Sequence, residues 1–407
     1  MSDFKLIEPK KQIINFKRIL PHPLHEYQTK MSFTVIIIAA RPGNVATHLH
    51  VFLIGMNFKK TFYKITHWET WPYRVKYIPL IPAWLWYCLR SGSWWFFTPS
   101  NPSLTFGGFE GERKSEMYDQ LPPGSYPKSI YISPLLSFDE VERLITSHNY
   151  AYPFVVKPDI GTMGFMFRKI DNADQLKQYH EKMPSDYIIQ ELVTYPLEVS
   201  VFYYRFPDQQ KGTITGFLKK EFLEVGGDGR STLWELIQNY DRVQFRLEEM
   251  KAKHEHKLND IIPEGEIYIL SHALNLSRGG KLVSLEHEKD DRLLKVFDDL
   301  SHYTKHFYYG RYDLKCTSVE DLKEGKNFSI LEYNGSGAEP HHAYGNGNTL
   351  LQAHKIFLHH WKILYQISKY NDKLGIHYWD FKRGWKFLKA ARKEYNMLKK
   401  IDAETEL

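Results

Sequence analysis

The pattern of apolar and polar positions along the chain predicts a mixture of strands and helices. Residues 33–53 are typical of a buried strand, a Pro-Gly turn and a helix, the usual opening of an α/β domain. Further on, short apolar runs broken by Gly-bearing turns predict strands at 152–170, 187–193, 198–206 and 212–225. Helical periodicity predicts helices at 137–149, 173–183, 232–256, 293–307 and 350–370. We therefore expect an α+β or α/β protein with an antiparallel part in its middle.

Changes in this pattern divide the chain into four segments. We expect an N-terminal α/β domain over 1–130, a second part over 131–205, a third over 206–370 and a basic helical tail over 371–407. Linkers are expected near 130 and 205. The chain has 407 residues, which is too long for one compact core and fits this division.

Composition is that of an ordinary folded protein, at 43% hydrophobic and 25% charged residues. The two cysteines, Cys88 and Cys316, argue against a disulfide framework or a thiolate metal site and fit a reducing compartment. The first residues lack the apolar core of a signal peptide. The most apolar stretch, 77–89, is too short to span a membrane and contains two prolines. We expect a cytoplasmic protein.

Positive charge is concentrated near the C-terminus. Residues 381–400 hold eight Lys or Arg against one Glu, so the rest of the chain is close to neutral and shows no general nucleic-acid signature. Apolar side chains recur at helical spacing in this stretch and predict an amphipathic basic helix: Phe381, Trp385, Leu388, Tyr395 and Leu398. Such a helix either lies on an anionic membrane or a partner, or packs on the body with its basic face in water.

Tryptophan is concentrated near the other end, where six of the ten lie between positions 68 and 95. One interpretation is a bulky core with a substrate wall. The other is a surface that touches lipid headgroups, where Trp rings are favoured.

Lys157 ends a very apolar strand, and a Gly-bearing loop framed by Gly161 and Gly164 follows it. Glycines let backbone N–H groups approach an anion closely, and a lysine at the strand end adds a charge. The arrangement suits the phosphates of a nucleotide, although no Gly-Lys-Ser/Thr of a Walker A loop follows. An ordinary hairpin fits the same residues.

The next strand runs into a connector that carries two acids. Glu191 stands at the strand end and Glu198 lies seven residues on. Backbone groups of such a connector can read an adenine edge, and a carboxylate can accept both ribose hydroxyls. Acids at strand ends are also commonly solvated, so this signal is weak alone.

Two later strands carry oxygen-bearing side chains. Asp313 lies on the first, and Glu332 and Asn334 lie two positions apart on the second, so these two share a face. Oxygen-only ligation of this type suits Mg²⁺, with Mn²⁺ as a substitute. The adjacent His341 and His342 do not share a face in regular structure, and we interpret them as loop or substrate contacts.

The order of these motifs resembles the ATP-grasp superfamily over residues 105–345. The family pattern also has an earlier phosphate-binding lysine, and Lys114 fits that place, with Arg113 where an Asp usually stands. "GRYDL" with "LEYNGSG" looks like D-alanine–D-alanine ligases. "KKEFLEVGGDGRSTLWELI" and "HALNLSRGGKLVSLEHE" look like the ATP-grasp module of cyanophycin synthetases and of the fused glutathione-synthesising enzymes.

This resemblance implies a fold with the nucleotide held between two antiparallel-sheet subdomains, 131–205 being the lid and 206–370 carrying the metal site. It implies that Lys114, Lys157 and Lys220 bind phosphates, under the loop of Gly161 and Gly164. Adenine would contact the connector Gln190, Glu191, Leu192 and Val193, and Glu198 would take the ribose. Asp313, Glu332 and Asn334 would hold one or two Mg²⁺, and Arg311, with Lys157, would act in catalysis. Ser277, Gly279 and Gly280 would cradle a second substrate or form a simple turn.

The implied reaction is an ATP- and Mg-dependent union of a carboxylate with an amine through an acyl phosphate. The substrates would be small molecules of amino-acid or peptide type. An ATP-grasp kinase and a non-catalytic nucleotide-binding protein are the alternatives. No nucleic-acid partner is expected, while a homodimer and a peripheral membrane contact of the basic helix are left open.

Overall fold

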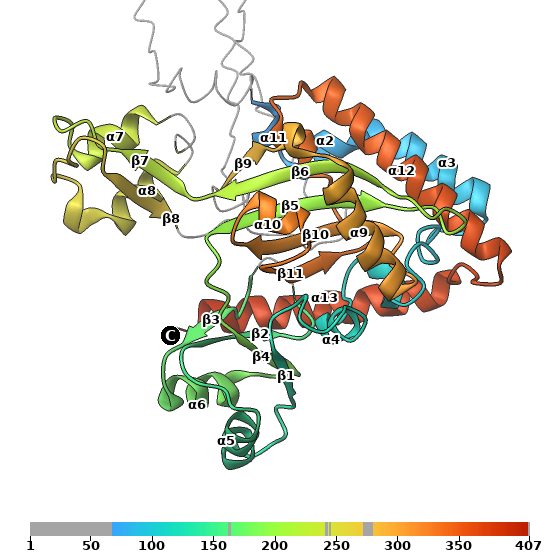
Figure 1. The fold of residues 1–407 in the computed structure, drawn as a ribbon, viewed down its shortest axis with the longest axis horizontal. Coiled ribbons are helices and arrows are strands. Elements are labelled where there is room, and N and C mark those ends of the chain that lie inside the picture. The colour runs from blue at the N-terminus through green and yellow to red at the C-terminus, as the bar shows by residue number, and fades with distance from the viewer. Residues whose placement is uncertain (1–66, 162–163, 241–242, 244–245, 272–279, 406–407) are drawn as a thin grey trace, which may run out of the picture. The chain divides into compact units, whose positions relative to one another are not determined.

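The computed structural model describes residues 67–405 except 162–163, 241–242, 244–245 and 272–279 (Figure 1). All described residues belong to one compact unit, Gly55–Leu407. The strand–turn–helix expected at 33–53 therefore lies outside the described residues, as do Ser277 and Gly279.

The first sheet is antiparallel and belongs to the segment predicted as a lid. Its strand order is β1-β4-β2-β3. Their bounds are Ser129–Ile132 (β1), Tyr187–Glu191 (β4), Phe154–Pro158 (β2) and Arg168–Ile170 (β3). The helices α5 (Phe138–Ser147) and α6 (Ala173–Lys182) pack on it through a core of aliphatic and tyrosine side chains. The helix α5 begins with the predicted capping box, in which the Ser137 N–H and hydroxyl both donate to the Glu140 carboxylate at 2.7 Å.

The second sheet is also antiparallel and carries the predicted metal ligands. Its strand order is β11-β10-β5-β6-β9. Their bounds are Phe328–Asn334 (β11), Tyr309–Cys316 (β10), Leu197–Tyr204 (β5), Thr213–Glu221 (β6) and Lys281–Ser284 (β9). One side packs on α9 (Asp291–Thr304) and α4 (Lys114–Tyr118), where Phe297, Tyr312 and Tyr118 are buried.

A two-stranded extension forms a separate small core. It pairs β7 (Leu223–Gly226) with β8 (Ile267–Ser271), and α7 (Leu233–Asn239) and α8 (Leu247–Lys253) cover it. The turn that follows β7 is closed by Asp228, whose carboxylate accepts from the N–H groups of Arg230 and Ser231 at 2.9 and 2.7 Å. This is the Gly-Asp-Gly turn of the sequence.

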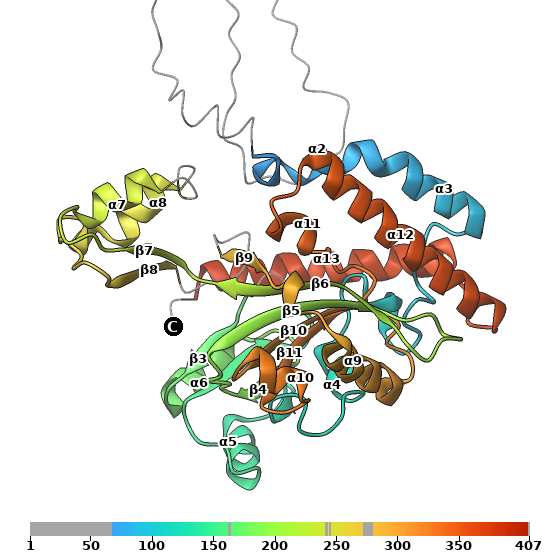
Figure 2. The ribbon, with the colours of Figure 1, turned by 45° about the horizontal axis from the view of Figure 1, so that its top comes forward.

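The Trp-rich segment folds into helices that pack on a late part of the chain. The helices α2 (Tyr73–Tyr77) and α3 (Ile81–Ser91) lie beside α12 (Leu350–Lys373), as Figures 1 and 2 both show. Trp84 of α3 meets Phe96 and Trp361 edge to face, with ring centroids 4.6 and 5.0 Å apart. The short helix α11 (His342–Gly345) contacts α12 and strands β6 and β9. Short 3-10 turns complete the described part: Trp68–Thr70, Ile78–Leu80, Thr105–Gly108, Glu255–Lys257 and Glu286–Glu288.

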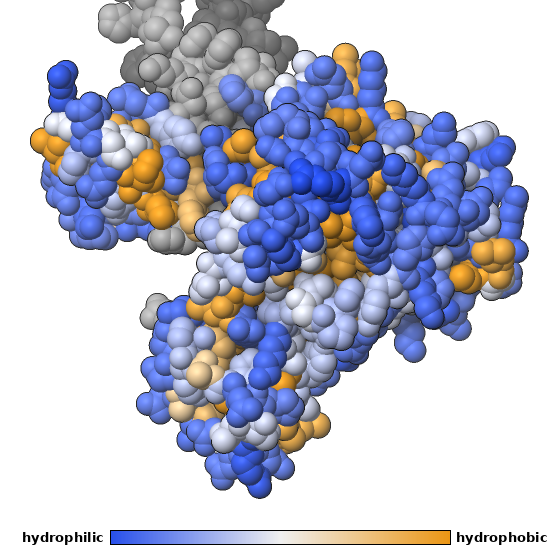
Figure 3. Space-filling model, in the orientation of Figure 1, coloured by the Kyte–Doolittle hydropathy of each residue, from blue (hydrophilic) through white to orange (hydrophobic). Residues whose placement is uncertain are grey.

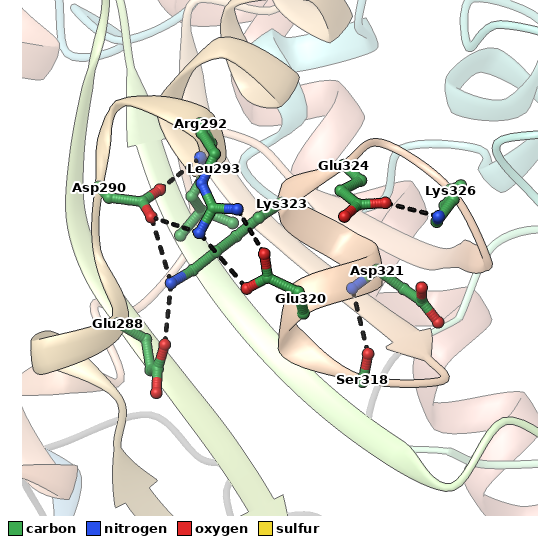
Figure 4. A network of polar contacts seen from close by, with 10 residues as sticks. All are labelled: Glu288, Asp290, Arg292, Leu293, Ser318, Glu320, Asp321, Lys323, Glu324 and Lys326. Atoms are coloured by element: carbon green, nitrogen blue, oxygen red, sulfur yellow. Dashed lines mark hydrogen bonds and ion pairs between the residues drawn. The ribbon is translucent and has the colours of Figure 1, made fainter.

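An ion-pair network anchors α10 (Val319–Lys323), the helix that joins β10 to β11 (Figure 4). The nearly buried Lys323 ammonium lies 2.8 Å from Glu288 and 3.3 Å from Asp290, at the start of α9. Arg292 on α9 pairs with Glu320 on α10. The network fastens the crossover between the two strands that carry Asp313 and Glu332.

The predicted basic helix exists as α13 (Phe381–Ala403), and it packs on the body. Leu398 is 1% exposed and belongs to the core of the first sheet. Close by, the Arg168 guanidinium pairs with Asp402 at 2.9 Å, and Figure 1 shows the C-terminal end beside β3. Earlier in the helix, Phe387 packs edgewise on Trp379 in the aromatic core around α3. One helix therefore contributes to two cores.

The predicted fold class, a mixture of helices and antiparallel sheets, is confirmed. The division into four segments stays a prediction. No helix of the described ranges combines the length and hydropathy that crossing a bilayer requires. On the face seen in Figure 3, hydrophilic residues predominate and apolar residues form separate patches.

Candidate functional site

The centre of the candidate site is a pair of neighbouring strands, β10 and β11. Asp313 stands directly opposite Glu332, and Arg311 stands opposite Asn334. Opposed residues of an antiparallel pair point to the same face, as do residues two apart on one strand. The structure thus brings the three predicted metal ligands and the predicted catalytic arginine together on one face of the second sheet.

Asp313 is a buried carboxylate surrounded by nitrogen donors. The Arg311 guanidinium donates to both of its oxygens at 3.1–3.3 Å, and the Asn334 amide donates to Oδ2 at 3.3 Å. The Lys220 ammonium lies 3.2 Å from Oδ1. Burial alone would raise the pKa of Asp313, but the charges of Arg311 and Lys220 hold that pKa well below its usual range. The carboxylate is therefore ionised at any physiological pH.

Glu198, predicted to bind ribose, lies in the same cluster. Its Oε1 is 3.1 Å from the Lys220 ammonium, which stands opposite it on β6. Burial opposes the charge of Lys220, yet Asp313 and Glu198 together raise its pKa. Lys220 thus bridges the predicted ribose carboxylate and the predicted metal ligand. The ribose contact itself stays a prediction.

Two more of the predicted phosphate lysines lie near this face, Lys157 on β2 of the first sheet and Lys114 at the start of α4. Lys157 donates to the Tyr118 hydroxyl at 2.8 Å and to the Leu331 carbonyl at 3.3 Å. Lys114 donates to the Gly161 carbonyl at 2.8 Å. Burial lowers the pKa of both lysines, that of Lys157 to about 8, while the Glu332 carboxylate counteracts the shift in each. Among the acids near the two ammonium groups, Glu332 thus acts most strongly on both, without direct contact.

The glycine loop and the connector lie at the edges of this cluster. Gly164 has φ of 73°, a left-handed conformation that favours glycine, and Gly161 faces Pro158 and Leu398. In the connector, the buried Gln190 amide donates to Ser129 at 2.7 Å, and the Val193 carbonyl accepts from Lys315 at 3.2 Å. A pocket of about 550 Å³ opens beside the connector, and its lining includes Glu191, Leu192, Val193, Tyr126 and Phe328.

The turn after β11 packs backbone to backbone on an N-terminal loop. The N–H groups of Ser336 and Gly337 donate to the carbonyls of Gly107 and Gly108, each at 3.1 Å. A Cβ on Gly337 would lie 1.9 Å from the Phe109 carbonyl oxygen, so only glycine fits there. The loop that follows the Trp-rich segment is therefore in direct contact with the turn after β11.

The two histidines have different surroundings. His342 lies in the core, where its Nε2 is 3.4 Å from that of His360 and its ring fills the space beside Gly216. The interpretation of His342 as a loop residue does not fit this packing, because it begins the helix α11. His341 lies beside Arg311 and Asp313, and burial, with the charge of Arg311, lowers its pKa well below the usual value.

Sequence reasoning missed three groups around the lysines. Tyr118 is buried and accepts from Lys157. Asp159 is buried, pairs with Arg113 at 3.1 Å and accepts from the Ser115 N–H at 2.8 Å, so it holds the first turn of α4 against the first sheet. Burial raises the pKa of Glu112 to about 7, against the charge of Lys114. Of these three residues, only Asp159 had a local signal in the sequence, which is its position two residues after Lys157.

The donor set fits Mg²⁺ in its chemistry. Two carboxylates and one amide oxygen, on one face and near the lysines predicted to bind phosphate, are the ligand types that this ion prefers. In the described ranges, no group of three or more His, Cys, Asp or Glu side chains gathers as a metal site by itself. The remaining coordination positions would thus fall to water and phosphate oxygens.

No known family profile matches the sequence, and no curated protein matches it. Solved structures that resemble this fold include several ligases. A bifunctional glutathione synthetase from Pasteurella multocida is 14% identical over 57% of this chain and 34% of its own length, with a TM-score of 0.36. The chain thus spans about a third of that protein.

A D-alanine–D-alanine ligase from Bacillus anthracis is 14% identical over 65% of this chain and 67% of its own, with a TM-score of 0.34. The ATP-grasp ligase PsnB is 15% identical over 61% and 60%, with a TM-score of 0.31. The chain is similar to these ligases at a distance that transfers no activity. We rest the functional proposal on the geometry of the site.

Proposed function

We propose that this protein is an ATP- and Mg²⁺-dependent ligase that joins a small carboxylate to an amine. The observation that carries the proposal is the convergence of four cationic side chains and three oxygen donors. Arg311, Lys220, Asp313, Glu332 and Asn334 lie on one sheet, and Lys157 on β2 and Lys114 at the start of α4 lie near them. Transfer of a phosphoryl group passes through crowded negative charge, which such an array is suited to stabilise.

The proposed reaction has two steps. A substrate carboxylate oxygen attacks the γ-phosphorus of ATP, the bond to the β-phosphate oxygen breaks, and ADP leaves from an acyl phosphate. The amine nitrogen then attacks the acyl carbon, phosphate leaves, and the nitrogen loses a proton. Both steps need water to be excluded, because water would hydrolyse the acyl phosphate.

The side chains divide this work. Lys114, Lys157 and Lys220 neutralise the phosphates, under the loop framed by Gly161 and Gly164. The Arg311 guanidinium stabilises the negative charge that develops on the acyl oxygen, and Asp313 holds it in place through the bonds at 3.1–3.3 Å. Asp313, Glu332 and Asn334 would hold Mg²⁺, which would supply positive charge to neutralise phosphate oxygens.

The nucleotide base is proposed to lie along the connector. The pocket of about 550 Å³ beside Glu191, Leu192 and Val193 has a volume within the range typical of small-molecule sites. Its polar lining supports hydrogen bonding to an adenine edge through backbone groups. Glu198 would then bind the ribose. Lys220 would contact a phosphate in place of one of its two carboxylate partners.

The test is ATP consumption with pools of amino acids and small carboxylates, followed by mass spectrometry. ADP, phosphate and an amide product are expected. ADP with a stable phosphorylated product would overturn the ligase in favour of a kinase, and binding of ATP without turnover would favour a non-catalytic protein. Substrate omission identifies which pool supplies the carboxylate.

A further inference from the structure

A second surface, distant in sequence from the candidate site, combines exposed apolar side chains with positive charge. We call it the apolar face. It consists of Ile78, Ile81, Leu85, Trp86, Leu89, Trp94, Phe381 and Trp385. Their exposed fractions run from 39% for Leu85 to 78% for Leu89. Large apolar side chains gathered on a protein surface commonly mark an interaction site.

The helical part of the apolar face is one side of a helix whose other side is anchored. Ile78, Ile81, Leu85 and Leu89 follow at spacings of three, four and four residues, which places them on the same side. In the same stretch Leu80 and Cys88 are buried, Leu80 away from this side and Cys88 at its edge. The orientation of α3 is therefore fixed by its core contacts, and the apolar side is left facing outward.

The aromatic part of the apolar face joins the end of α3 to the start of α13. Phe381 meets Trp94 at 6.5 Å and Trp385 at 6.0 Å between ring centroids, and each of the three rings is about half exposed. The loop after α3 is fastened there, because the Ser93 hydroxyl donates to the Trp379 carbonyl at 3.0 Å. The ends of both helices also lie near each other in Figures 1 and 2. Phe381 thus joins Trp94 and Trp385 in one aromatic cluster, at the end of α3 that carries Leu89.

Cationic side chains border this surface. The Arg90 guanidinium lies over the Trp86 ring at 5.6 Å, and the Lys389 ammonium lies over the Trp385 ring at 5.5 Å. Lys382 and Lys386 are exposed on the same turns of α13 as Phe381 and Trp385. Residues 71–109 and 381–393 together contain nine Lys or Arg and no Asp or Glu, while Asp380 caps the start of α13. The basic side chains beside the exposed rings therefore favour an occupant that carries negative charge.

We propose that the apolar face docks this protein on the surface of an anionic lipid bilayer. Trp and Phe rings at the level of the headgroups, flanked by Lys and Arg, are the usual side chains of such a contact. Basic residues near an anionic leaflet add an attraction that no apolar groove of a neutral partner provides. A second copy of this chain would set the same positive charges against each other. The inference does not depend on the proposed reaction.

The test uses the full chain and two kinds of vesicle. Flotation is measured with vesicles of phosphatidylcholine alone and with vesicles that also contain phosphatidylglycerol. Binding to the anionic vesicles is expected, weakening as salt is raised because exposed charges are screened. Failure to bind anionic vesicles, or equal binding to both kinds, overturns the proposal.

Two pairs of variants locate the contact. Lys382→Gln with Lys386→Gln removes two charges and should weaken binding about 30-fold, while Lys177→Gln with Lys182→Gln, on α6, should leave it unchanged. Leu89→Glu should abolish binding, whereas Leu135→Glu, at a leucine that is 93% exposed on the first-sheet side, should not. Thermal melting checks that all variants fold. Equal effects of face and control variants, or a face variant that changes only the oligomeric state in gel filtration, overturn the proposal.

Discussion

The Lys157 ammonium on β2 donates a hydrogen bond to the Leu331 carbonyl on β11, at 3.3 Å, and so joins the two sheets. The bond is long for a charged donor, and the other partner of the lysine is a neutral tyrosine hydroxyl. Lys157 is thus buried without a carboxylate in direct contact. A phosphate group would supply the missing negative charge, and this expectation can be tested.

Replacing Lys157 by methionine should weaken nucleotide binding and stabilise the folded protein. Burial lowers the pKa of Lys157 from 10.5 to about 8, so the folded protein binds its proton more weakly than the unfolded chain does. The charged lysine therefore destabilises the folded protein. This destabilisation is complete below about pH 8 and disappears as pH rises toward 10.5. At pH 7 the variant should be more stable, by up to about 3 kcal/mol, while its affinity for ATP falls at least about tenfold.

Chemical denaturation and calorimetric titration with ATP measure the two effects of Lys157→Met. Lys182→Met, at the exposed end of α6, is the control and should change neither. A Lys157→Met protein that binds ATP as tightly as the original would show that this lysine does not contact phosphate.

Amide replacements should separate the roles of Asp313 and Glu332. Both Asp313→Asn and Glu332→Gln should lower Mg²⁺-dependent ATP turnover by about 100-fold or more, because each removes a carboxylate from the donor set. Asp313→Asn should destabilise the fold more than Glu332→Gln, by about 3 kcal/mol, since Asp313 is the carboxylate in direct contact with the buried Arg311 and Lys220.

Turnover across a Mg²⁺ series, together with urea denaturation, measures both effects. Glu324→Gln, which loses only an exposed pair with Lys326, is the matched control. Full Mg²⁺-dependent turnover in either site variant would remove that residue from the metal site.

Glu112 should impose a pH dependence on ATP binding near neutrality. Burial raises its pKa to about 7, so the carboxyl group gains its negative charge as pH rises through that value, close to Lys114. This charge should repel the phosphates and weaken ATP binding above pH 7. Glu112→Gln should flatten the dependence of Kd between pH 6 and 8 and strengthen binding at the upper end. A pH profile that the substitution leaves unchanged would exclude this group as its source.

Truncation of Leu398 should destabilise the first sheet, because this side chain packs in its core although it is far from the sheet in sequence. Leu398→Ala removes a side chain that is 1% exposed in that core and should cost about 2–4 kcal/mol. The neighbouring Met397→Ala, at a side chain that is 37% exposed, should cost less than about 1 kcal/mol. Urea denaturation followed by tyrosine fluorescence measures both. Equal effects of the two truncations would show that α13 is not docked through Leu398.

Local patterns in the sequence predicted the strands of the site well. Asp313 lies on β10, and Glu332 and Asn334 lie on β11, as predicted, because alternation and β-branched or aromatic content act over a few residues. The shared face of Glu332 and Asn334 follows from their spacing alone. That Asp313 stands opposite Glu332 could not be predicted in this way, because it depends on the register of the two strands. This register includes an irregularity after Asp313 that no local pattern encodes.

Partners that are remote in sequence could not be predicted. The five apolar residues of the basic helix were expected to form one stripe, but Leu398 is buried in the first-sheet core while Phe381 is 54% exposed. Helical spacing identifies a face and does not say what covers it. In the same way, the ion pair between Glu198 and Lys220 forms because β5 and β6 are neighbouring strands, which local sequence does not reveal.

The sharing of α13 between two cores limits how the first sheet can be treated as a module. The Met166 N–H donates to the Asp402 carboxylate at 2.8 Å across 236 positions of sequence. A fragment limited to 129–191 would lack Leu398 and expose an apolar groove in its place. Exchange of this sheet between related chains would therefore have to carry two separate stretches of sequence, and a recombination that moved only the contiguous one would produce an aggregation-prone hybrid.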